Sequence, residues 1–224
     1  DELERAGPGF AQQVVRPISH PIYPQGGIAV LSGNLAPGGA IIKQSAADPA
    51  LMEHEGRAVV FENLEDLAER IDRDDLDVTA QDVLVLKNAG PKGAPGMPEA
   101  GYLPIPRKLA RAGVKDMVRI SDGRMSGTGF GTIVLHVTPE SAIGGPLAQV
   151  RNGVRIRLSV KARQITLLVP DAELAQRQLD KPITAPTADR GYRKLFLQTV
   201  LQADEGVDFD FLQAPQRLGK IPRC

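Results

Sequence analysis

The apolar residues of this chain fall into short runs, and that pattern limits which secondary structure the chain can form. The runs at residues 28–32, 40–43, 58–61 and 83–87 are four or five residues long, as strands commonly are. Glycine (23 residues) and proline (18 residues) separate them. We therefore expect a β-rich α/β fold with a barrel-like sheet of short strands flanked by helices.

The remaining elements follow from periodicity and turn signals. The alternation of apolar and charged residues over 154–169 predicts a hairpin. Residues 132–137 fit either a buried strand or the start of a helix, and 33–39 are interpreted as a loop. Helical segments are expected at 49–55, 64–73, 106–112, 172–179 and 191–203.

Composition restricts the function classes. We interpret residues 1–16 as a linker and 17–224 as one domain. The 27 basic and 27 acidic residues balance, so we expect no nucleic-acid partner, and no apolar run is long enough for a membrane span. The absence of a secretory signal and the presence of a single cysteine, Cys224, favour the cytoplasm.

The stretch 120–139 holds four glycines and two serines between apolar runs. Gly123, Gly127, Gly129 and Gly131 permit positive φ angles and close approach to a ligand. Ser126 is a candidate catalytic hydroxyl, although it equally fits the cap of a helix beginning at residue 128. Nearby, Asp122 and Arg124 fit an ion pair that braces the turn.

A second glycine- and proline-rich loop, 88–99, ends in Glu99. The prolines around it restrict the backbone, and a carboxylate held in this way suits Mg²⁺; the alternative is a solvated acid. Lys92 in this loop lacks the spacing of a phosphate-binding P-loop. Both loops follow expected strands, where α/β proteins commonly bind ligands.

Three motifs carry a resemblance to a known family. These are Gly-Pro-Lys-Gly-Ala-Pro-Gly-Met-Pro-Glu from Gly90, Ser-Asp-Gly-Arg-Met-Ser-Gly from Ser121, and His-Val-Thr-Pro-Glu-Ser-Ala-Ile-Gly-Gly-Pro-Leu from His136. Together they resemble the C-terminal part of the IlvD/Edd dehydratases, whose corresponding half is a swivelling β/β/α domain. The reading Arg-Met-Ser-Gly-Thr-Gly-Phe-Gly from Arg124 is most similar to dehydratases of unphosphorylated aldonates, such as pentonates.

The resemblance implies a hydro-lyase that converts a 2,3-dihydroxy sugar acid into a 2-keto-3-deoxy acid. It implies that Ser126 is the base, with Thr128 in support, and that Glu99 binds a Mg²⁺ that stabilises the enediolate. Less directly, Ser121, Asp122, Arg124 and Gly127 are expected to support the loop or the substrate.

The resemblance covers only about the last two-fifths of a family member. It implies a preceding domain that holds an iron–sulfur cluster and completes the Mg²⁺ site, so the isolated chain is expected to be inactive. A homo-oligomer is also expected. The alternatives are a dihydroxy-acid dehydratase of branched-chain amino-acid synthesis, a stand-alone binding domain without enzymatic activity, or one subunit of a split enzyme.

Overall fold

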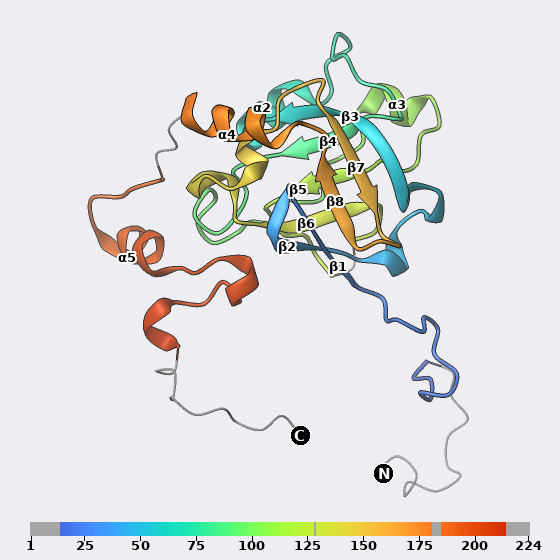
Figure 1. The fold of residues 1–224 in the computed structure, drawn as a ribbon, viewed down its shortest axis with the longest axis horizontal. Helices are drawn as coiled ribbons and strands as arrows, with labels where there is room; N and C mark the ends of the chain where they lie inside the picture. The colour runs from blue at the N-terminus through green and yellow to red at the C-terminus, as the bar shows by residue number, and fades with distance from the viewer. Residues whose placement is uncertain (1–13, 128, 181–184, 214–224) are drawn as a thin grey trace, which may run out of the picture.

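The strands of the computed structural model close into a barrel (Figure 1). The structure describes residues 14–127, 129–180 and 185–213, and within them the strand order around the barrel is β1-β2-β6-β5-β4-β3-β7-β8. The strands are β1 (Ala29–Gly33), β2 (Ala36–Ile42), β3 (Glu53–Phe61), β4 (Val83–Leu86), β5 (Arg119–Ser121), β6 (Ile133–Thr138), β7 (Arg155–Ser159) and β8 (Gln164–Leu167).

Short helices surround the barrel. The α-helices are α2 (Leu64–Arg70), α3 (Arg107–Arg111), α4 (Asp171–Asp180) and α5 (Gly191–Thr199). The 3-10 helices are η1 (Gln44–Ala46), η2 (Pro49–Leu51), η3 (Ser141–Ile143), η4 (Pro146–Gln149), η5 (Ala203–Glu205) and η6 (Asp210–Leu212). In Figure 1, α5 lies to one side of the barrel. No helix in the described ranges is both long and apolar enough to cross a membrane.

Strand direction determines which loops meet. β3, β4, β5 and β6 are mutually parallel, whereas the pairs β1–β2, β2–β6, β3–β7 and β7–β8 are antiparallel. A parallel bridge from Ser32 to Gln164 joins β1 to β8 and closes the barrel. The carboxyl ends of β3 to β6 therefore lie at one rim, which we call the carboxyl rim, as in other parallel sheets.

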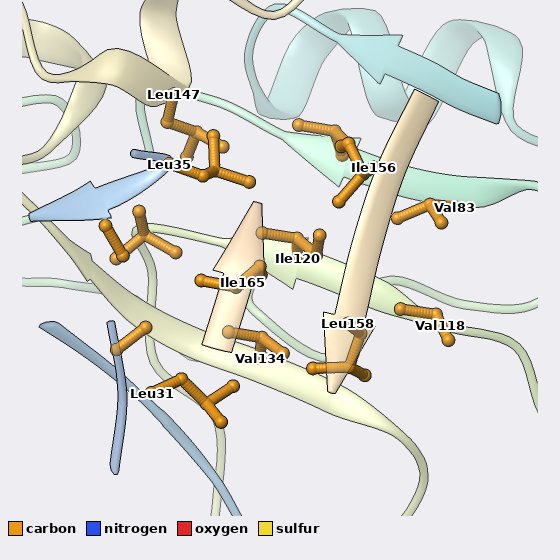
Figure 2. Packing of buried hydrophobic residues seen from close by; sticks show 14 of the residues in the cluster. Leu31, Leu35, Val83, Val118, Ile120, Val134, Leu147, Ile156, Leu158 and Ile165 are labelled. Atoms are coloured by element: carbon orange, nitrogen blue, oxygen red, sulfur yellow. The ribbon is translucent and has the colours of Figure 1, made fainter. Parts of the chain in front are cut away.

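The parallel strands are buried on both faces. Val83 and Val85 of β4 point into the barrel interior, where Figure 2 shows apolar side chains from most of the strands packed together. Leu84 and Leu86 point outward into a second apolar cluster that includes residues of α2. Because α2 covers this outer face, β4 is continuously apolar rather than alternating.

Most of the elements expected from the sequence are confirmed, with two corrections in β2 and β3. The barrel-like sheet, the 154–169 hairpin (β7–β8) and the strand β6 are present. The expected loop at 33–39 was wrong, because β2 begins at Ala36 and pairs with both β1 and β6. The expected helical turn at 49–55 ends at Leu51, and β3 begins at Glu53 because β7 supplies a distant partner for its backbone.

Candidate functional site

Asp122 ties three loops together at the carboxyl rim. It follows β5, is 1% exposed, and accepts hydrogen bonds from the backbone N–H of Ala89 (2.9 Å) and of Ser141 (2.8 Å). Burial raises the pKa of Asp122 to about 6, while these two N–H groups act in the opposite direction. Its carboxyl therefore joins the loops that follow β4, β5 and β6.

The carboxylate of Glu140 binds backbone N–H groups of the second glycine-rich loop, residues 88–99. Its carboxylate accepts hydrogen bonds from the N–H of Lys92 (2.9 Å) and Gly93 (2.9 Å), and from Nε2 of Gln202 (2.8 Å). A Cβ on Gly90 would lie 2.6 Å from the carboxylate, which explains the glycine. The Gly-Pro-Lys-Gly motif thus cradles an anion, as a phosphate-binding loop does, but the anion belongs to this chain.

Arg124 connects this loop to the serine-bearing loop. Its Nη1 lies 3.0 Å from Oε1 of Glu99, its Nε donates to the carbonyl of Met97 (2.5 Å), and its own carbonyl accepts from the N–H of Gly101 (2.8 Å). The sequence had suggested an ion pair between Asp122 and Arg124. That interpretation was wrong, because the backbone directs Asp122 into the rim and Arg124 toward Glu99.

We call residues 121–132 the serine loop, and it runs as a crossover from the end of β5 to the start of β6. Ser121 is fully buried, and its Oγ accepts a hydrogen bond from the N–H of Gly123 (2.9 Å), so it shapes the turn. Ser126 is partly exposed and Gly127 is exposed on the loop. Thr128 lies outside the described residues. The described residues that flank position 128 are not helical, so the helix-cap alternative for Ser126 lacks its helix.

An ion pair braces the second half of the serine loop. Arg119, which is 2% exposed, lies 2.6 Å from Asp116 through Nη2, and Asp116 accepts from both the N–H and the hydroxyl of Thr132 (2.8 Å each). Gly131 adopts a φ of +123°, and a Cβ there would clash with the guanidinium of Arg119. Glycine is therefore required where the chain passes this ion pair.

Two residues near the serine loop were missed by the sequence reasoning. Lys43 follows β2 directly, and its Nζ donates to the carbonyls of Gly127 and Gly129. It lies 84 residues away from Gly127 in sequence, so no local pattern signals the contact. Glu140 belongs to the third recognised motif, but its role depends on pairing with a loop 47 residues away.

His136 lies on β6 beneath the serine loop. Its backbone N–H donates to the carbonyl of Gly123 (3.1 Å), and its Nδ1 is buried without a partner among the described residues. Burial, followed by the nearby charge of Arg124, lowers the pKa of His136 below its usual value. The ring is therefore neutral at pH 7 and adds no positive charge to the site.

The chain's own residues can supply a ligand for Mg²⁺ but not the set of thiolates that an iron–sulfur cluster needs. Glu99 is a half-exposed carboxylate, and one or two such oxygen ligands are what Mg²⁺ takes from a protein. No group of three or more His, Cys, Asp or Glu residues arranged to hold a metal occurs in the described part of the chain. An iron–sulfur cluster needs several thiolates, and the sequence has only Cys224, outside the described residues, so the cluster does not fit this chain.

Comparison with known proteins places these features in a family context. The family model described as "Dihydroxy-acid/6-phosphogluconate dehydratase C-terminal" matches residues 13–207. An L-arabonate dehydratase of Azospirillum brasilense is 53% identical over 93% of the chain and 37% of its own length. A 6-deoxy-6-sulfo-D-gluconate dehydratase of Pseudomonas putida is 49% identical over 99% of the chain and 39% of its own length.

A less similar relative is named for a different substrate class. A dihydroxy-acid dehydratase of Nitratidesulfovibrio vulgaris is 44% identical over 79% of the chain and 32% of its own length. The chain thus spans less than two-fifths of the length of each of these three relatives.

Proposed function

From the premise that this chain belongs to the dihydroxy-acid/6-phosphogluconate dehydratase family, whose C-terminal domain it matches, we propose that it is the catalytic C-terminal domain of a sugar-acid dehydratase. The reaction would remove water from an unphosphorylated aldonate and give a 2-keto-3-deoxy acid. The identities of 53% and 49% to dehydratases of sugar acids, against 44% to a dihydroxy-acid dehydratase, favour this substrate class.

The observation that carries the proposal is the contact between the two loops through Arg124. Its guanidinium lies 3.0 Å from Glu99, and Ser126 follows it by two residues. A candidate metal ligand and a candidate base, 27 positions apart in sequence, are thereby held on adjoining loops. Eliminating water from a 2,3-dihydroxy acid requires this pairing of a base with a site for the acid's oxygen atoms.

In the proposed mechanism, Ser126 acts as an alkoxide and takes the proton from C2 of the substrate, which returns the serine to its hydroxyl form. The C2–H electron pair forms a double bond to C3, the C3–O bond breaks, and the leaving hydroxide takes the proton from Ser126 to become water, which restores the alkoxide. The enol then tautomerises to the 2-oxo acid. Thr128 would support Ser126 through its hydroxyl, while Ser121, Asp122 and Gly127 shape the loop that carries the base.

Glu99 would be this chain's ligand to Mg²⁺, which when bound supplies positive charge for the substrate's carboxylate and C2 hydroxyl. Arg124 would fix the direction of the Glu99 carboxylate before the ion binds. The described residues offer no thiolate ligand for an iron–sulfur cluster.

We propose that the rest of the site comes from a preceding iron–sulfur domain, since each relative compared above extends well beyond the matched region. Residues 17–224 would then form one domain, preceded by a linker, of a cytoplasmic homo-oligomer. Exposed apolar side chains support such contacts; Val14 and Ile18 are 87% and 99% exposed.

The full-length protein tests the proposed function. It should be assayed for 2-oxo acid formation from pentonates, hexonates and branched-chain 2,3-dihydroxy acids. We expect kcat/KM for at least one unphosphorylated aldonate to exceed that for the branched acids by about tenfold or more. The reverse preference would favour the dihydroxy-acid alternative, and no turnover with retained ligand binding would favour a non-enzymatic domain.

A further inference from the structure

We propose that Lys43 is a positioning residue for the serine loop, because it holds the part of the loop that follows Ser126 and places there a positive charge whose hydrogen-bond partners among the described residues are neutral. This inference rests on the function proposed above. The contact joins the end of β2 to residues that lie one and three positions after Ser126.

The first argument is the geometry of the segment that follows β2. The Nζ of Lys43 donates to the carbonyls of Gly127 and, at 3.4 Å, of Gly129. Farther along, the carbonyl of Ala46 accepts from the N–H of Gly131 (2.8 Å). The second half of the serine loop is therefore fastened to a segment more than 80 residues away in sequence, and the Lys43 contact lies closer to Ser126 along the chain than the Ala46 contact does.

The second argument compares the two ends of the loop. On the side before Ser126, the Arg124 guanidinium pairs with the opposite charge of the Glu99 carboxylate. On the side after Ser126, both hydrogen-bond partners of the Lys43 ammonium among the described residues are neutral carbonyl oxygens. Lys43 thus adds net positive charge close to the serine that must give up its proton.

The third argument is that the loop needs an external support. Gly127 is exposed and has no atom within 4 Å of where its Cβ would be, so side-chain packing does not hold the loop there. Phe130 is 67% exposed and adds no buried anchor. A loop segment with few packed side chains depends on polar contacts, and a small displacement of a catalytic group lowers the rate strongly.

The experiment uses the metal-loaded full-length protein and three variants. Lys43→Met removes the donor and the charge, Lys43→Arg retains both, and Lys161→Met is the control, since Lys161 is an exposed lysine in the β7–β8 turn. We expect Lys43→Met to lower kcat for the sugar acid by about tenfold or more with KM within about twofold. Lys43→Arg should recover most of the rate, and Lys161→Met should match the wild type.

A readout independent of turnover is chymotrypsin cleavage after Phe130. We expect Lys43→Met to be cleaved at least about threefold faster there than the wild type, because the loop opens more often. Unchanged cleavage, an unchanged kcat, or a higher KM at constant kcat would each overturn the proposal. If the wild type lacks sugar-acid turnover, the proposed function fails, while cleavage still decides whether Lys43 holds the loop.

Discussion

The replacement Asp122→Asn tests the electrostatics of the carboxyl rim. Asp122 is 1% exposed, and its two oxygens accept hydrogen bonds from Ala89 and Ser141. Burial nevertheless raises the pKa of this carboxyl from 3.8 to about 6 in the folded chain. Asparagine has the shape of the protonated side chain and does not titrate, so the variant removes the pH dependence that Asp122 causes.

The sign and the size of the pH dependence that Asp122 causes follow from proton linkage. Between pH 3.8 and about 6, the unfolded carboxyl has lost its proton while the folded one retains it, so stability falls as the pH rises. At about 1.4 kcal/mol for each pH unit, this interval corresponds to about 3 kcal/mol. The variant's free energy of unfolding, relative to wild type, should therefore increase by about 3 kcal/mol between about pH 3.5 and pH 7.

The assay is urea unfolding of the 224-residue chain and its variants across this pH range. Asp82→Asn is the matched control, and we expect its effect on the free energy of unfolding to change with pH in the opposite direction. Burial opposes ionisation of Asp82, but hydrogen bonds from Arg57 and Thr79 outweigh it and lower the pKa of that carboxyl. The ionised Asp82 carboxylate stabilises the folded wild type, and this contribution is lost as the pH falls. The free energy of unfolding of Asp82→Asn should therefore decrease relative to that of the wild type as the pH rises. A pH-independent difference for Asp122→Asn, or one that decreases as the pH rises, would refute the reasoning.

Two further substitutions probe the serine loop. Arg124→Met should change the free energy of unfolding by less than about 1 kcal/mol, because its partner Glu99 is half exposed. The same variant should lower sugar-acid turnover in the full-length protein by about tenfold or more. Turnover equal to that of the wild type would contradict the role of Arg124 in joining the two loops. Gly131→Ala should destabilise the chain by about 2–4 kcal/mol in urea unfolding, because it combines a positive φ with a clash against Arg119. Gly113 also has a positive φ (+90°) but lies in open space, so Gly113→Ala should cost only about 1 kcal/mol, and equal losses would count against the clash.

The fold was predictable where the local sequence of a strand is enough to identify it. The run 83–87 was identified because β4 is buried on both faces and so is continuously apolar. β2 was partly missed because Pro37, Gly38 and Gly39 resemble a loop in sequence. Their place in a strand is decided by pairing with β1 and β6, and no local window contains that information.

The candidate site was predictable in part. Glycine density, together with a serine and a proline-restricted glutamate, indicated the two loops, and the structure shows that Arg124 joins them. The catalytic and metal-binding roles of Ser126, Thr128 and Glu99 remain predictions. Lys43 and Glu140 were missed because their partners lie far away in sequence, and the topology of the barrel alone brings them together.

The central claim is that Ser126 is the base of a sugar-acid dehydratase, and its removal in the full-length protein tests this most directly. Ser126→Ala and the control Ser32→Ala, an exposed serine of β1, should be compared at equal metal content with an aldonate substrate. We predict that Ser126→Ala lowers kcat by about a thousandfold or more, while Ser32→Ala matches the wild type. A rate for Ser126→Ala within about threefold of the wild type would contradict the account.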